Sequence, residues 1–264
     1  MALSAKWDDL VARLGSAVVM VAVGLLAIWM GGWVFRLLVA AICGAMIWEL
    51  MRMIGGGQAM ARGLGLLSAA CLLLASVLPA GFALPLVMAP AFVGLSRMTM
   101  HHGVFMPFSV AILLAGFGMM ALRMDFGLVW LMWLVLVVVV TDVAGYFAGR
   151  ILGGPKFWPK VSPKKTWSGT IAGWVGAAGV GLIFWIAGAS GPNVVGVSIA
   201  LSMASQMGDI AESAIKRRMG VKDSSQLIPG HGGLLDRFDG MLGAALFLLL
   251  VEQVVDFPPV AVTP

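Results

Sequence analysis

Two acids, a hydroxyl and a lysine recur at helical spacing between residues 209 and 216. Asp209, Glu212, Ser213 and Lys216 occupy positions i, i+3, i+4 and i+7. Residues at these spacings share one face of a helix, so the segment is predicted to carry a polar stripe on an otherwise apolar helix. Such a stripe favours a cavity inside the protein over contact with lipid. A solvated helix end is the alternative.

Further carboxylates stand where a metal ion could bind. Asp236 and Asp239 are three residues apart, which places both on one helix face, and two hard oxygen ligands on one face suit Mg²⁺. Capping of a helix by either residue is the alternative. Asp142 follows the apolar run 137–141. A carboxylate at the centre of a membrane span costs about 2.5–3.5 kcal/mol, so Asp142 and Asp209, near the cytoplasmic ends of their spans, are predicted to face the protein interior. A carboxylate that reaches water or pairs with an arginine is the alternative.

Basic side chains flank these acids in two clusters. One is the loop 162–166, with the sequence Ser-Pro-Lys-Lys-Thr, and the other comprises Lys216, Arg217, Arg218 and Lys222. Each cluster could instead anchor the chain at the membrane surface. The turn 229–233 has the sequence Pro-Gly-His-Gly-Gly, whose glycines would let backbone N–H groups approach a phosphate, although a plain turn explains them equally well. Together, the carboxylates and cations fit a metal-dependent reaction on a phosphate-bearing lipid.

The composition requires that a membrane surround these residues. Of the 264 residues, 61% are hydrophobic and 11% are charged, whereas an ordinary soluble domain is about 45–50% apolar and about 25% charged. A soluble enzyme, a nucleic-acid-binding module and a disordered regulator are therefore excluded. The net charge of +5 is not a nucleic-acid signal. Long continuous apolar runs predict an all-α, polytopic integral membrane protein.

Apolar runs and their breaks predict about nine transmembrane helices. These cover roughly 15–31, 33–51, 64–80, 82–96, 107–122, 127–149, 169–189, 194–211 and 240–256. With the N-terminus in the cytoplasm, every Lys and Arg except Arg36 and Arg123 falls on the cytoplasmic side, as the positive-inside rule requires. Small residues at four-residue spacing from Gly169 to Gly181 predict close helix packing in the seventh span.

Two polar segments, 150–168 and 209–239, interrupt the apolar pattern. One predicted helical hairpin separates them, so both lie on the cytoplasmic side and can build one site. We therefore predict an N-terminal transmembrane bundle over 1–122, acting as scaffold or lipid gate. A C-terminal catalytic region over 123–264 would carry the cytoplasmic loops 150–168 and 210–239.

The segment 213–239 matches the pattern S-x-x-K-R-x4-K-D…P-x-H-G-G-x-x-D-R-x-D at every fixed position. In this it closely resembles the signature of the phosphatidate cytidylyltransferases, also called CDP-diglyceride synthases. The segments 141–150 and 162–166 are similar to that family as well, and the resemblance covers about residues 125–256. One departure is Ser168, which stands in Trp-Ser-Gly where the family usually has a glutamate before the glycine.

The resemblance implies an enzyme that transfers CMP from CTP to phosphatidate, giving CDP-diacylglycerol and pyrophosphate for phospholipid biosynthesis. It would lie in a bacterial-type cytoplasmic (inner) membrane, with its active site facing the cytoplasm. The attacking lipid phosphate is already an anion, so the enzyme must align two polyanions and suppress their repulsion. The resemblance also implies Mg²⁺, leaves a second cation such as K⁺ open, and suggests a homodimer.

Residue roles follow from the same resemblance. The expected catalytic residues are Asp209, Lys216, Arg217, Asp236, Arg237 and Asp239. The expected Mg²⁺ ligands among them are Asp209, Asp236 and Asp239, with Asp142 behind them or on a second metal. The expected nucleotide-binding residues are Lys164, Lys165, Lys222, Asp223, His231, Gly232 and Gly233. The expected contacts to the lipid phosphate or pyrophosphate are Ser213, Lys216, Arg217 and Arg237.

Three alternatives remain at this point. A membrane polyprenol or dolichol kinase that uses CTP would transfer the γ-phosphate and release CDP. An anion transporter would also use charge in a membrane cavity, but its charges should reach both faces and its sequence should show paired repeats. A structural membrane protein would not need Asp142 and Asp209 at membrane depth.

Overall fold

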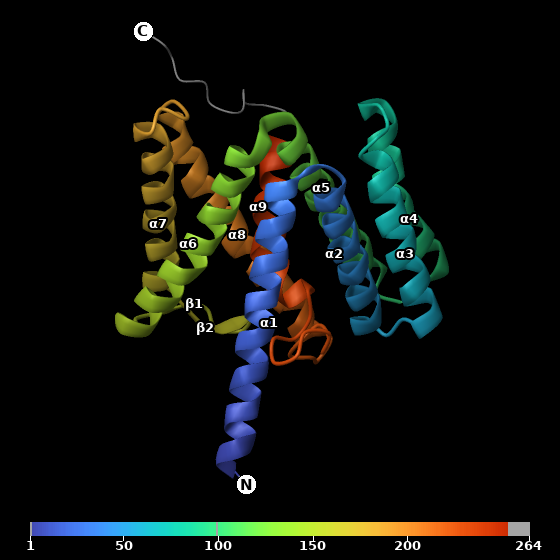
Figure 1. Ribbon diagram of the computed structural model, residues 1–264. Coiled ribbons are helices and arrows are strands. Elements are labelled where there is room, and N and C mark those ends of the chain that lie inside the picture. Colours follow the sequence, from blue (N-terminus) through green and yellow to red (C-terminus); the bar gives the residue numbers. More distant parts are fainter. Residues whose placement is uncertain (1, 99, 253–264) are drawn as a thin grey trace. The chain divides into compact units, whose positions relative to one another are not determined.

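The computed structural model describes residues 2–98 and 100–252, with the side chains of this part except those of residues 2–13 and 80. These residues form helices and one short β-hairpin (Figure 1). The helices are α1 (Ala2–Met30), α2 (Gly32–Met53), α3 (Gln58–Ala75), α4 (Ala80–Arg97), α5 (His102–Ala121), a π-helical turn (Leu122–Phe126), α6 (Gly127–Ile151), α7 (Trp167–Ile186), α8 (Asn193–Arg218) and α9 (Leu235–Val251). The hairpin pairs β1 (Lys156–Trp158) with β2 (Ser162–Thr166). The end of the ninth predicted span and the side chains of Lys6 and Arg13 lie outside the described residues.

The described residues contain five helical segments that are long and apolar enough to cross a membrane. They are Gly32–Met53, Gln58–Ala75, His102–Ile151, Trp167–Ile186 and Asn193–Arg218. The predicted all-helical membrane protein is thus confirmed, while nine crossings and a cytoplasmic N-terminus stay predictions. The third segment has 50 residues and would measure about 75 Å if straight, more than twice the hydrocarbon thickness of about 30 Å. Its backbone breaks at Gly127, whose φ of +86° a continuing helix does not adopt.

Chain contacts divide the protein into two compact units. The first unit joins α1–α5 to the segment Arg218–Phe238, and the second joins Asp125–Arg217 to the part of α9 that begins at Asp239. The predicted C-terminal region includes the whole loop 210–239. In the structure, residues 218–238 of that loop pack with the N-terminal helices.

Close helix packing in the first unit depends on glycine. A Cβ atom at Gly44 of α2 would lie 2.6 Å from the carbonyl oxygen of Gly65 in α3, and the reverse distance would be 2.7 Å. Arg123 fixes the end of α1, since its Nε donates to the carbonyl oxygen of Ile28 at 3.0 Å. A cation at a helix C-terminus also interacts favourably with the helix dipole.

The second unit uses small residues in the same way, as predicted for the seventh span. A Cβ atom at Gly169 of α7 would lie 2.5 Å from the carbonyl oxygen of Gly145 in α6. Helices α8 and α9 cross where a Cβ at Gly208 or at Gly243 would lie 3.0 Å from the Cα of the other glycine. The N-terminus of α7 is capped by Thr166, whose Oγ1 accepts from the Gly169 N–H at 3.2 Å.

Polar side chains of α8 hold this helix to its neighbours. Thr141 Oγ1 donates to Ser202 Oγ at 2.8 Å, and Trp133 Nε1 donates to Ser198 Oγ at 3.0 Å. Gln206 accepts from Trp174 Nε1 at 3.0 Å and donates to the carbonyl oxygen of Thr170 at 3.1 Å. These bonds fix the rotation of α8, so the residues that follow Gln206 on the same face also point inward.

Candidate active site

A cavity of about 540 Å³ lies in the second unit, among α6, the hairpin, α7 and α8. Its lining includes the charged side chains of Asp142, Arg150, Lys164, Lys165 and Asp209. Four of these are predicted site residues. Arg150, which the sequence places in the family-like segment 141–150 without a predicted role, also lines the cavity. Arg150 donates to the hydroxyl of Tyr146 at 2.7 Å, and Tyr146 also lines the cavity.

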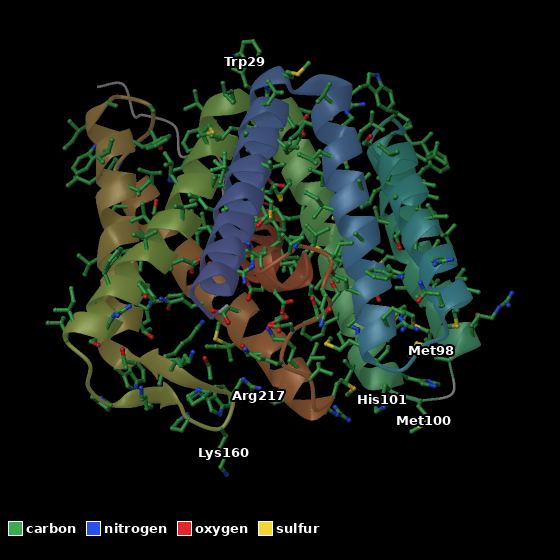
Figure 2. All side chains as sticks on the ribbon, turned by 60° about the horizontal axis from the view of Figure 1, so that its bottom comes forward. Trp29, Met98, Met100, His101, Lys160 and Arg217 are labelled. Atoms are coloured by element: carbon green, nitrogen blue, oxygen red, sulfur yellow. The ribbon has the colours of Figure 1, made fainter. Side chains whose placement is uncertain are left out.

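The hairpin places the two lysines. Lys164 and Lys165 lie on β2, which pairs with β1 in antiparallel register, Lys156 opposite Thr166. The hairpin joins α7 through a hydrogen bond from the Trp167 N–H to the Pro155 carbonyl oxygen at 3.0 Å. Phe157 and Trp167 stack edge to face with their ring centroids 4.7 Å apart. Lys160, at the turn of the hairpin, is exposed and lies outside the cavity lining (Figure 2).

Ser168, the departure from the family pattern, belongs to the base of the hairpin. Its hydroxyl donates to the carbonyl oxygen of Gly153 and lies 3.0 Å from Thr166 Oγ1. Ser168 is not among the residues that line the cavity. The serine therefore holds the connection between α6 and β1 and brings no charge to the site.

Three carboxylates gather around one lysine in this unit. Lys165 Nζ lies 2.5 Å from Asp209 Oδ2, and both side chains are partly exposed. Asp142 and Asp239 experience the negative charge of Asp209 and the positive charge of Lys165. Asp239 also accepts from the Gly240 N–H at 2.7 Å. With all carboxylates ionised, this group carries two uncompensated negative charges.

The donor set of this group suits a hard divalent cation, because carboxylate oxygens are the ligands that Mg²⁺ prefers. Among the described residues, no three His, Cys, Asp or Glu side chains are already arranged to hold a metal ion. Asp209 and Asp239 belong to the second unit and Asp236 to the first. The Mg²⁺ ligand set therefore stays a prediction.

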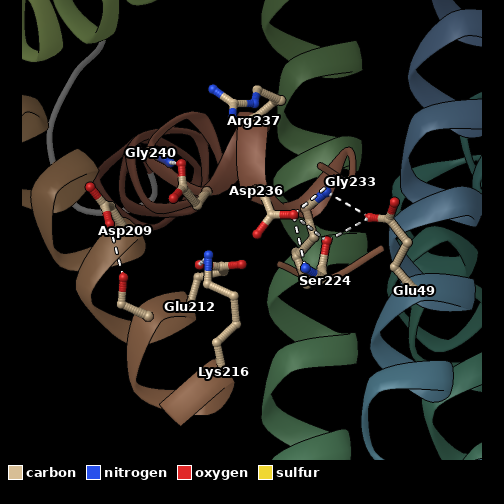
Figure 3. A network of polar contacts seen from close by, with 12 residues as sticks. Glu49, Asp209, Glu212, Lys216, Ser224, Gly233, Asp236, Arg237 and Gly240 are labelled. Carbon is tan, nitrogen blue, oxygen red and sulfur yellow. Dashed lines mark hydrogen bonds and ion pairs between the residues drawn. The ribbon is translucent and has the colours of Figure 1, made fainter. Parts of the chain in front are cut away.

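The polar stripe on α8 is confirmed, since all four residues lie on this helix. Ser213 Oγ donates to Asp209 Oδ1 at 3.3 Å, and Lys216 Nζ lies 2.6 Å from Glu212 Oε2 (Figure 3). The Glu212 side chain is only 2% exposed, so a solvated helix end is wrong for this residue. Lys216, expected at a substrate phosphate, thus pairs with a buried acid. Arg217, next along the chain, is exposed (Figure 2).

The remaining motif residues belong to the first unit. These are Lys222, Asp223, His231, Gly232, Gly233, Asp236 and Arg237. Asp236 Oδ2 accepts three hydrogen bonds, from the Ser224 N–H at 2.9 Å, from Ser224 Oγ at 2.8 Å and from the Gly233 N–H at 2.8 Å. Arg237 Nε donates to the carbonyl oxygen of His231 at 2.7 Å.

The backbone of the turn 229–233 adopts conformations that favour glycine. Gly230 and Gly232 have φ values of +74° and +82°, which favour glycine. A hydrogen bond from the Ile228 N–H to the Gly232 carbonyl oxygen, at 2.8 Å, closes the turn. His231 Nδ1 lies 2.8 Å from Ser16 Oγ of α1. A structural turn accordingly accounts for these glycines, and phosphate binding by Gly232 and Gly233 stays a prediction.

Glu49 of α2 is a second residue that sequence reasoning missed. It is fully buried and accepts hydrogen bonds from Ser225 Oγ at 2.6 Å and from the N–H groups of Leu234 and Leu235 at 2.9 and 2.7 Å. These bonds explain why most of the loop packs in the first unit. The signal was present, because Glu49 is a lone acid inside an apolar run.

Comparison with known proteins agrees with the resemblance found in the motifs. The family model described as the cytidylyltransferase family matches residues 11–255. A phosphatidate cytidylyltransferase of Brucella suis biovar 1 (strain 1330) is 45% identical over 153 residues, 55% of this chain and 57% of that protein. One of Helicobacter pylori (strain ATCC 700392 / 26695) is 40% identical over 153 residues, 56% of each chain. One of Staphylococcus haemolyticus (strain JCSC1435) is 36% identical over 163 residues, 60% of this chain and 63% of that protein. The matched stretch thus covers less than two thirds of each relative.

Proposed function

Because the chain belongs to the cytidylyltransferase family, we propose that it transfers CMP from CTP to phosphatidate, forming CDP-diacylglycerol and pyrophosphate. The observation that carries the proposal is the cavity of the second unit. It combines Lys164, Lys165 and Arg150 with Asp142 and Asp209 in a helical membrane protein. The names of the relatives, all phosphatidate cytidylyltransferases, support the same reaction.

In the proposed reaction, a phosphate oxygen of phosphatidate attacks the α-phosphorus of CTP. A new P–O bond forms, the bond between the α-phosphorus and the bridging oxygen breaks, and pyrophosphate leaves with that electron pair. The nucleophile is already an anion, so no strong base is required. The protein must overcome repulsion between the two substrates, and preorganised cations do this best in a site that excludes water.

The cations of the cavity divide this task. Lys164 and Lys165 are proposed to bind the CTP phosphates, and Arg150, which shares the cavity lining, to bind the leaving pyrophosphate. The ion pair with Asp209 holds the ammonium of Lys165 in place before substrate arrives. Bound Mg²⁺ would add charge neutralisation at the phosphates. Asp209 and Asp239 are its proposed ligands, with Asp142 near them, and Asp236 stays in the predicted set.

The membrane arrangement belongs to the same proposal. We infer nine crossings, a cytoplasmic N-terminus and an active site that faces the cytoplasm of a bacterial inner membrane. The cationic hairpin 156–166 supports this orientation through the positive-inside rule. A homodimer and a second cation such as K⁺ remain proposals from the family resemblance.

The test is an assay of the purified full chain in detergent with Mg²⁺, phosphatidate and CTP labelled separately at the α and γ positions. The proposal expects the α label in lipid and the γ label in pyrophosphate. Appearance of the γ label in lipid, with release of CDP, would instead identify a kinase. If neither label moves while the protein remains folded, the proposed reaction is wrong.

A further inference from the structure

Glu49 is a buried carboxylate to which the proposed mechanism gives no task. Its exposed fraction is 0%, and its neighbours Ile47, Leu50 and Met51 are also buried. Removing an ionised carboxylate from water is costly unless hydrogen bonds or an opposite charge compensate it. The groups that donate hydrogen bonds to Glu49 therefore indicate its structural role.

Among the described residues, all the hydrogen bonds to the Glu49 side chain come from one distant segment, 224–235. Oε1 accepts from Ser225 Oγ at 2.6 Å and from the Leu234 N–H at 2.9 Å. Oε2 accepts from the Leu235 N–H at 2.7 Å, and Ser224 Oγ, which donates its proton to Asp236, lies 3.4 Å away. No described lysine, arginine or histidine forms an ion pair with Glu49. Leu235 begins α9, so the negative charge also lies at a helix N-terminus, where the dipole favours it.

The same segment has little freedom to take another path. Ser224 Oγ donates to Asp236 Oδ2 at 2.8 Å and also approaches Glu49, so it joins the two acids (Figure 3). A Cβ atom at Gly233 would lie 2.5 Å from Glu49 Oε1, which leaves no room for a side chain there. Glu49 and Asp236 together therefore determine the backbone conformation of 224–235.

We propose that Glu49 is a positioning residue for the cytidylyltransferase reaction, which acts through the backbone of 224–235. The inference rests on the proposed function, because Lys222 and Asp223, which directly precede this segment, and His231 within it are the residues expected to bind the nucleotide. Glu49 itself is fully buried, and its hydrogen-bond partners among the described residues are protein groups of that segment. Through it, α2 takes part in presenting the nucleotide-binding motif, beyond serving as scaffold.

The test replaces Glu49 with glutamine, which keeps the size of the side chain but removes half of its acceptor capacity. The Ser224 and Ser225 hydroxyls can turn to accept from the new amide group, but the Leu234 and Leu235 N–H groups cannot. One of these N–H groups therefore loses its acceptor. We expect Glu49→Gln to raise the KM for CTP about tenfold, equivalent to about 1.4 kcal/mol. The KM for phosphatidate should stay within about twofold.

Backbone amide exchange provides the second measurement. Exchange in 224–235 should become faster in Glu49→Gln, while exchange in α3 and α5 should not change. The control is Ser68→Ala in α3, because Ser68 is fully buried, has no hydrogen-bond partner among the described residues and lies in the same unit. It should leave the KM for CTP and the loop exchange unchanged. A general loss of folded enzyme would lower kcat and leave both KM values alone.

Wild-type KM for CTP together with wild-type exchange in 224–235 would overturn the proposal. If Glu49→Gln does not fold, Ser225→Ala decides, since it removes one donor from the loop side and leaves Glu49 in place. It should raise the KM for CTP about threefold, and an unchanged KM would overturn the proposal. If the wild-type protein transfers no CMP, the proposed function fails. Even in that case, unchanged amide exchange of 224–235 in Glu49→Gln would refute the inference that Glu49 holds this backbone segment.

Discussion

The ion pair between Lys165 and Asp209 allows the sharpest test of the candidate site. Lys165→Met keeps the length of the side chain but removes its charge, so the carboxylates of Asp142, Asp209 and Asp239 lose the cation next to them. Loss of one charge-stabilising donor in an active site costs about 10²–10³ in rate. Because the Lys165 side chain is 26% exposed, solvent screens part of its effect. We therefore expect kcat/KM for CTP to fall about 10²-fold.

Although Lys165→Met lowers kcat/KM for CTP, it should strengthen the binding of Mg²⁺. Without Lys165, the net charge of the carboxylate group becomes more negative by one unit, so the Mg²⁺ concentration that gives half-maximal rate should fall. A titration of initial rate against Mg²⁺ at saturating CTP measures this. The matched control is Lys160→Met on the same hairpin, which removes an equal charge outside the cavity and should leave kcat/KM within about twofold.

Two results would refute this reasoning. If Lys165→Met retains a kcat/KM within about threefold of wild type, Lys165 is a membrane anchor and the cavity is not the nucleotide site. If Lys160→Met loses as much activity as Lys165→Met, the lysines act through the general positive potential of the hairpin. Thermal unfolding in detergent should be measured for both variants, so that a loss of fold is not mistaken for a loss of chemistry.

Three further predictions follow from the second unit. Asp239→Asn should lower activity at least about 10²-fold, since charge stabilisation by a metal is worth several kcal/mol. The control Asp125→Asn lies between the predicted spans 107–122 and 127–149, on the outer side when the N-terminus is cytoplasmic, and should do little in the same assay. Ser168→Ala should lower the free energy of unfolding by about 1 kcal/mol, seen in detergent melting, because the bond to Gly153 is lost. Gly169→Val should destabilise the protein by at least about 2 kcal/mol, because its Cβ would meet the Gly145 carbonyl oxygen; an unchanged melting temperature would contradict that packing.

Local periodicity was sufficient to predict part of the site. Asp209, Glu212, Ser213 and Lys216 share a face of α8 because the helix repeat alone sets which residues lie together. Small residues from Gly169 onward likewise predicted the close contact with α6. Hydropathy predicted a helical membrane protein, because a bilayer requires every backbone polar group to be paired within the segment.

Features that depend on distant residues were not predictable in this way. The segment 162–166 is predicted as a cationic loop but forms strand β2 of the hairpin. Strands of only three and five residues give little periodic signal, and contacts with Trp167 stabilise them. Glu49 carries no motif, and its partners lie 175 or more positions further along the chain. The segment Arg218–Phe238 packs in the first unit because of those partners. A prediction that divides the chain at residue 122 from local hydropathy could not include this long-range contact.

Biosynthesis of this chain must proceed for some time before Glu49 has its partners. Leu235 follows Glu49 by 186 residues, and at about 5–20 residues per second the ribosome needs about 10–40 s to reach it. Until Ser224, the first residue of the segment 224–235, has been made, α2 contains a carboxylate with none of its native hydrogen-bond donors. A chain that stops before Ser224 keeps this carboxylate without those donors, which is costly in apolar surroundings. Completion of the segment 224–235 thus also supplies the polar partners of a carboxylate in the second helix.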